Sequence, residues 1–151
     1  MTTSSAVLLT THLAATAAMA GLIWLVQMVH YPLFAQVGVD QFIDYETSHI
    51  NRTGPVVGPF MAIEGLTALA IPIFYRDSVG IVLPAIGLLL LAIIHASTIW
   101  LQVPAHTVLS EGYDPEAWSR LVSTNWIRTI GWSARTVVAG WLIVKAVSTT
   151  A

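Results

Sequence analysis

Four apolar segments occupy most of the chain, and each is long enough to cross a lipid bilayer. A helix needs about 20 mostly apolar residues to span the hydrocarbon, and the qualifying segments are residues 6–34, 56–75, 79–103 and 121–147. Only 9% of the 151 residues are charged, whereas a soluble domain has about 25%. The sequence therefore predicts an all-α integral membrane protein, in which residues 1–151 form a single four-helix transmembrane domain with antiparallel, up-down topology.

The connections between the predicted helices are short. Phe42, Tyr45 and His49 recur at helical spacing between the first two segments, which predicts a short interfacial helix between helices 1 and 2. Residues 76–78 separate the second and third segments, so these two helices are expected to form a hairpin. Asp114 stands directly before a proline and is the expected N-cap of the fourth helix.

Charge and composition limit the location and the partners. Lysines and arginines are nearly equal in number on the two sides of the bundle, and we favour an orientation with both termini cytoplasmic in the plasma or inner membrane. The N-terminal apolar run lacks a basic region and is too long for a signal peptide, so we expect it to be retained. The net charge of -2 gives no basic surface for nucleic acid. The absence of cysteine excludes disulfides, thiolate metal ligands and cysteine nucleophiles.

Polar residues follow one face of the third and the fourth helix. Steps of three and four residues connect members of the fourth helix, namely Trp118, Leu121, Asn125, Arg128, Trp132 and Arg135. The same steps connect members of the third helix, namely Leu91, His95, Thr98, Gln102 and Ala105. This spacing is typical of a packed helix seam, so both stripes are expected to point into the bundle.

Two prolines lie near the ends of the first and third helices. Pro32 has no N–H to donate to the carbonyl of Met28, and Pro104 has none for the carbonyl of Trp100. A free carbonyl at membrane depth has to be satisfied by protein or by water. Both prolines therefore indicate a polar interior near these helix ends.

Histidines from three helices are expected to converge on the half of the bundle opposite the termini. Helix direction places His30, His49, His95 and His106 there, with Glu64 deeper. A lone buried histidine is more often a satisfied interior imidazole, but four of them beside a carboxylate suit iron, copper or zinc. We expect His30, His49 and His106 to be candidates for one ion, while His95 and Glu64 would form a deeper layer.

Glu64 and Arg135 fall at similar depth in the predicted bundle. A structural ion pair between the second and fourth helices is one interpretation, since an unpaired charge there is costly. The other is that Glu64 binds a metal or accepts a proton, while Asn125 and Arg128 position an oxygen of a substrate. We take Glu64, Asn125 and Arg128 as the candidate catalytic residues.

Arginines and tryptophans near the same mouth are candidates for cofactor binding. Arg52 and Arg128 suit an anionic head group or haem propionates, although simple snorkelling to the interface explains them as well. Trp118 and Trp132 lie on the inward stripe and would line an aromatic cavity, whereas tryptophans of membrane proteins are more often packing or belt residues.

The stretch from Gln102 to Arg135 resembles the anthrone-oxygenase-like family of small four-helix membrane proteins. The matching features are a polar residue and a proline near the end of the third helix, a short loop, and then Trp118, Asn125 and Arg128. The sequence HYPLF at the end of the first helix is compatible. The resemblance implies an oxygenase acting on a lipophilic polycyclic phenol.

Three functions follow from these observations. The first is a membrane-embedded oxidoreductase that uses a histidine-held metal and a lipophilic substrate. The second is a b-type haem protein with two axial histidines. The third is a non-enzymatic accessory subunit of a larger membrane complex, whose polar seam joins helices. The bilayer and a lipophilic small molecule are the expected partners, and a homo-oligomer stays open.

Overall fold

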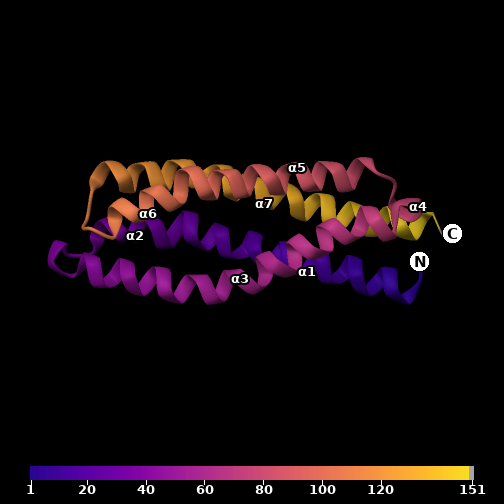
Figure 1. The fold of residues 1–151 in the computed structure, drawn as a ribbon, viewed down its shortest axis with the longest axis horizontal. Coiled ribbons are helices and arrows are strands. Elements are labelled where there is room, and N and C mark those ends of the chain that lie inside the picture. The colour runs from indigo at the N-terminus through magenta and orange to yellow at the C-terminus, as the bar shows by residue number, and fades with distance from the viewer. Residues whose placement is uncertain (150–151) are drawn as a thin grey trace.

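The computed structural model describes residues 1–149, and all of its regular structure over this range is helical. The elements in chain order are α1 (Thr3–Leu25), η1 (Val26–His30), α2 (Tyr31–Leu33), η2 (Phe34–Gln36), η3 (Val39–Gln41), α3 (Phe42–Phe74), α4 (Arg76–Val79), α5 (Val82–Ser97), η4 (Thr98–Gln102), α6 (Val103–Leu109) and α7 (Pro115–Ser148). Both termini and α4 lie at one end of an elongated bundle, and the other two connections lie at the opposite end (Figure 1).

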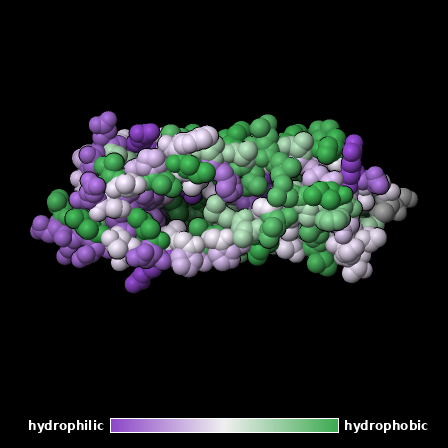
Figure 2. Space-filling view, viewed as in Figure 1, coloured by the Kyte–Doolittle hydropathy of each residue, from purple (hydrophilic) through white to green (hydrophobic). Residues whose placement is uncertain are grey.

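These elements form four continuous stretches that are long and apolar enough to cross a membrane. The stretches are Thr3–Gln36, Val39–Phe74, Val82–Leu109 and Pro115–Ser148. The predicted all-α four-helix fold is therefore confirmed, and each helix is longer than its predicted apolar segment. Hydrophobic residues cover the middle of the molecule, while hydrophilic residues gather mainly at the end away from the termini (Figure 2).

The short interfacial helix expected between the first two spans is not a separate element. Residues 42–49 are instead the first turns of α3, which continues through Pro55 and Pro59. Proline fixes φ close to the helical value, and membrane helices tolerate it where protein or water satisfies the freed backbone carbonyl. Because α3 is continuous, the side chains of its first turns lie on the same rod as its membrane-spanning part.

The fourth predicted helix begins and packs as expected. Asp114 caps α7 by accepting a hydrogen bond from the Ala117 N–H at 2.8 Å. Packing of α7 against both α1 and α5 places it centrally, whereas α3 packs mainly on α1 and barely touches α6. One core cluster joins three of these helices through Met19, Ile94 and Trp132.

Both predicted proline sites are preceded by a π-helical turn. The Tyr31 N–H bonds the carbonyl of Val26, and the Val103 N–H bonds that of Thr98, each five residues back. A π turn accommodates one extra residue, so it changes which side chains share a face before and after it. Each π turn therefore determines which side chains point into the bundle before and after the proline.

The π turn in η4 corrects the stripe predicted for the third helix. The buried residues before it are Ile94 and Ser97, not His95 and Thr98. The next buried residue, Gln102, follows Ser97 by five positions instead of four. A helix with a regular 3.6-residue period cannot include a step of five between buried residues. The inward face predicted for the third helix is therefore wrong by one residue before η4.

Candidate metal centre

Glu46, His49 and His106 form a compact group near the end of the bundle away from the termini. One ligand atom from each residue lies within 4.8 Å of the other two. Glu46 and His49 are three residues apart on α3, so they share one helix face. His106 comes from α6, whose direction is set by the turn before Pro104. Two imidazoles and one carboxylate are a donor set able to hold a metal ion.

A short contact connects two members of this group. His106 Nδ1 lies 2.5 Å from Glu46 Oε1, in a salt-bridge geometry. The Glu46 side chain is fully buried, and its second oxygen, Oε2, has no hydrogen-bond partner within residues 1–149. A buried carboxylate oxygen without a partner is unfavourable, so this group suits a bound cation.

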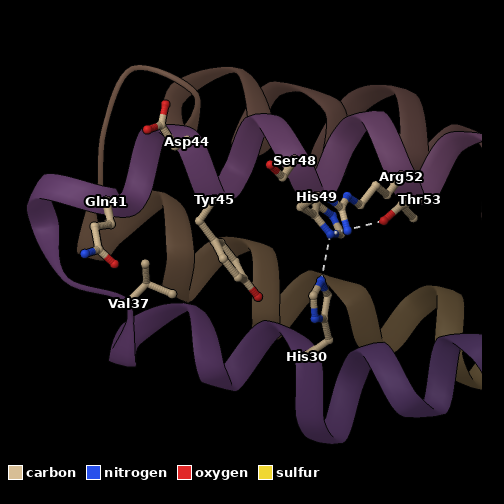
Figure 3. A pocket seen from close by; sticks show the side chains of 9 residues that line it. All are labelled: His30, Val37, Gln41, Asp44, Tyr45, Ser48, His49, Arg52 and Thr53. Carbon is tan, nitrogen blue, oxygen red and sulfur yellow. Dashed lines mark hydrogen bonds between the residues drawn. The ribbon is translucent and has the colours of Figure 1, made fainter.

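Further polar side chains contact one ring nitrogen of each imidazole and orient the two rings. His49 Nδ1 lies 2.7 Å from His30 Nε2 and 3.1 Å from Thr53 Oγ1, as the dashed lines in Figure 3 show. His106 Nε2 lies 3.0 Å from the Tyr31 hydroxyl. Partners of this kind fix the ring orientation and basicity of metal-binding histidines.

Three of the four histidines expected to meet do so. His30, His49 and His106 are joined through direct contacts, with His30 behind His49. His95 is placed elsewhere, because its Nδ1 lies 2.9 Å from the Leu91 carbonyl of its own helix. The sequence analysis did not single out Glu46, although this residue lies within the expected interfacial helix. The spacing Glu-x-x-His, which recurs in carboxylate-bridged metal proteins, would have pointed to it.

A lateral cavity of about 310 Å³ adjoins the metal group between α3 and the η4–α6 segment. His49, His106 and Tyr31 contribute to its wall, together with Gln102 and Arg128. Gln102 Oε1 and Arg128 Nε are buried atoms without a hydrogen-bond partner within the described part of the chain. Figure 2 shows a recess on this side of the molecule. One acceptor and one donor therefore lie unpaired on two residues of the cavity wall.

Arg128 and Trp132 are neighbours on α7, with the guanidinium 5.5 Å from the indole centroid. Arg128 also interacts electrostatically with Tyr31. Asn125 is fully buried, and its Nδ2 donates to Gln27 Oε1 at 2.9 Å. Of the predicted oxygen-positioning pair, only Arg128 lines the lateral cavity.

Glu64 and Arg135 form the ion pair that was one of the two interpretations of these residues. Arg135 Nε donates to Glu64 Oε1 at 2.7 Å, and Trp132 Nε1 donates to Glu64 Oε2 at 2.9 Å. Arg135 Nη1 donates to the Gly87 carbonyl. Both carboxylate oxygens are thus engaged, and the deeper metal layer expected from Glu64 and His95 is not assembled. His12 lies near this pair and bonds Thr67.

The remaining cofactor candidates lie apart from one another. Trp118 Nε1 donates to the Tyr31 carbonyl at 2.8 Å and packs beside the ring of Tyr113. The Trp132 indole is fully buried against the Glu64 pair. Arg52 is exposed on α3 and lines an outer groove with His30 (Figure 3). These three residues therefore do not surround a common cavity.

The comparisons with known proteins return no matching family model, no matching curated protein and no matching solved structure. The fold and the side-chain geometry define the class of protein: a four-helix protein with membrane-spanning character and a two-histidine, one-carboxylate group able to hold a metal ion.

Proposed function

We propose that this chain is a membrane-embedded metalloprotein that oxidises a lipophilic substrate. The observation that carries the proposal is the group Glu46, His49 and His106 on the wall of a lateral cavity. A two-histidine, one-carboxylate set that leaves coordination positions open is typical of non-haem iron oxygenases. The proposed location is the plasma or inner membrane, with both termini cytoplasmic.

The existing contacts indicate which atoms would bind the ion. His49 Nδ1 is already engaged by His30 and Thr53, so His49 Nε2 is its free donor. His106 Nε2 is engaged by Tyr31, which leaves Nδ1 on the side of Glu46. The ion would then lie between these nitrogens and the Glu46 carboxylate, with His30 and Tyr31 orienting the ligands.

Zinc in hydrolases uses the same ligand types, but oxidation is better supported here. Metal-assisted hydrolysis needs a positioned base in addition to the ligands. The other fully buried carboxylate of residues 1–149 is Glu64, and both of its oxygens accept hydrogen bonds from Arg135 and Trp132. Haem is disfavoured because His30, His49 and His106 contact one another or their neighbours directly, whereas axial histidines face each other across an iron.

The lateral cavity is the proposed substrate site. Its opening faces the side of the bundle, where Ile50 and Val103 are exposed, so a lipophilic molecule reaches it from the bilayer. Arg128 and Gln102 line the cavity, so the guanidinium would donate to an oxygen of the substrate and the amide would pair with a hydroxyl. Such a molecule agrees with the phenolic substrate that the family resemblance implies.

Dioxygen is the proposed oxidant, since the reaction then needs no separate reductant. Two C–H bonds of a substrate methylene break and one C=O bond forms with one oxygen atom of dioxygen. The other oxygen atom leaves with both hydrogens as water, so the substrate loses four electrons and dioxygen gains four. The bound metal supplies the redox chemistry, while Arg128 and Tyr31 hold the substrate oxygen and the His106 ring.

Metal analysis of the purified full chain tests the proposal. We expect about one equivalent of iron after purification in detergent without chelator, because a buried three-ligand group binds tightly. Glu46→Gln and His106→Ala should reduce the content at least tenfold. His95→Ala is the matched control on the same membrane span, and it should retain the metal.

Two results would contradict the proposal. One is a wild-type protein below about a tenth of an equivalent of any transition metal, since the ligand set then holds no ion. The other is an equal loss of metal in His95→Ala and His106→Ala, because only His106 belongs to the group. Consumption of dioxygen with a phenolic lipophile, lost in Glu46→Gln, tests the reaction itself.

A further inference from the structure

A second binding region runs along the outer seam between α1 and α3. It consists of a polar cavity of about 620 Å³ and an apolar cavity of about 460 Å³. His30, Arg52 and Thr53 line both cavities, so the two form one continuous groove. We call it the α1–α3 groove.

The two parts of the groove differ in character. Its apolar part is lined by aliphatic side chains of both helices, namely Leu22, Leu25, Val26, Val29, Val56 and Val57. Its polar part extends toward the end of the bundle, past Ser48 and Tyr45 (Figure 3). An occupant therefore needs a long apolar tail joined to a polar head.

Arg52 stands where the two parts meet. Its side chain is exposed and makes no ion pair within residues 1–149. The acidic residue that lines the polar part, Asp44, lies eight positions earlier on α3, about 12 Å along the helix axis. The junction is thus positively charged, and it offers the Thr53 hydroxyl and the His30 ring beside the guanidinium.

We infer that the α1–α3 groove binds an anionic phospholipid of the surrounding membrane. Its phosphate would lie on Arg52, since guanidinium and phosphate pair with good geometry. One acyl chain would follow the aliphatic part between Leu22 and Val56. A chain surrounded by bilayer meets phospholipid at every exposed seam, and the charge at Arg52 selects the anionic kind. The groove adjoins the lateral cavity, with which it shares His49, Thr53 and Val57, whereas Arg52 lines the groove alone.

Native mass spectrometry of the detergent-solubilised full chain tests the inference. The probes are dioleoyl phosphatidylglycerol and dioleoyl phosphatidylcholine, which share their acyl chains and differ in net charge. We expect the anionic lipid to bind about fivefold more tightly, the effect of one arginine at an anionic head group. Arg52→Gln should abolish this preference. Arg120→Gln, which alters another exposed arginine in the first two turns of α7, should leave it intact.

A third variant probes the apolar part. Val56→Trp fills the aliphatic part of the groove and should weaken the binding of both lipids, without removing the preference between them. Equal affinity of the wild type for the two lipids would overturn the inference. A preference that persists in Arg52→Gln, or that disappears equally in Arg120→Gln, would also overturn it. Metal content is expected to be unchanged in Arg52→Gln, so the result is independent of the proposed oxidation.

Discussion

Glu46 Oε1 and His106 Nδ1 lie 2.5 Å apart, and this pair joins the second turn of α3 to α6. The two helices scarcely touch otherwise. The lateral cavity opens where they diverge, and His49 and His106 stand in its wall. The same contact therefore closes one end of the bundle and brings the candidate metal ligands beside the candidate substrate site.

Metal binding should stabilise the fold, because the ion replaces the Glu46–His106 contact with stronger bonds between α3 and α6. At a free metal concentration 100 times the dissociation constant, the free energy of unfolding rises by about 2.7 kcal/mol. We expect a chelator to lower the melting temperature of the wild type by about 5 to 10 °C in detergent. Glu46→Gln should show no shift. A chelator effect of the same size in Glu46→Gln would contradict the ligand assignment.

The Tyr31 hydroxyl should tune the metal affinity without binding the metal. It lies 3.0 Å from His106 Nε2 and fixes that ring. Loss of a partner that orients a ligand typically weakens metal affinity by about 10- to 100-fold, so Tyr31→Phe should raise the dissociation constant by this factor in a chelator competition titration. Tyr45→Phe is the control, since its ring lies beside His30 at 6.2 Å and not on His106. Unchanged affinity in Tyr31→Phe would refute the orienting role.

Most of the fold could be predicted from the sequence because hydropathy is a local property. Segment length and apolar content are sufficient to define membrane-spanning helices, and the direction of each helix then brings His30, His49 and His106 to the same end. The Asp114 cap was equally accessible, since it depends on two adjacent residues.

The wrong predictions concern which helix face is buried and which side chains meet, because neither follows from segment hydropathy. The π turn in η4 displaced the buried face of α5 by one residue, so His95 was assigned to a face that Ile94 occupies. Glu46 was not singled out as a ligand, although it lies within the expected interfacial helix and precedes His49 by three positions. Polar residues within a continuous helix cannot be separated from a surface loop by composition alone.

The Glu64–Arg135 pair should contribute to stability and not to metal binding. Both side chains are almost completely buried, and removing one partner of such a pair costs about 3 to 5 kcal/mol. We expect Glu64→Leu and Arg135→Leu each to lower the free energy of unfolding by this amount in mixed micelles. The double variant should recover part of the loss, because no unpaired charge remains. Metal content should stay at the wild-type level in every variant that folds, and its loss in Glu64→Leu alone would instead support a ligand role.

The contact of α5 with α7 at Gly131 provides a test of helix packing. A Cβ atom added at Gly131 would lie 2.7 Å from Ile94 Cγ1, which is closer than two carbons can approach without displacement. Gly131→Ala should therefore destabilise the bundle by about 1 to 3 kcal/mol through overpacking.

Gly140 is the matched control for Gly131, because it lies on the same helix and an added Cβ there meets no atom within 4 Å. Alanine is the better helix former, so Gly140→Ala should raise the free energy of unfolding by about 0.5 to 1 kcal/mol. Unfolding of both variants in mixed detergent micelles gives the two values under the same conditions. Equal stabilisation by the two substitutions would mean that α5 and α7 are farther apart at Ile94 than described. Destabilisation confined to Gly131→Ala would instead show that α5 packs tightly on α7 beside Trp132, whose indole donates to Glu64.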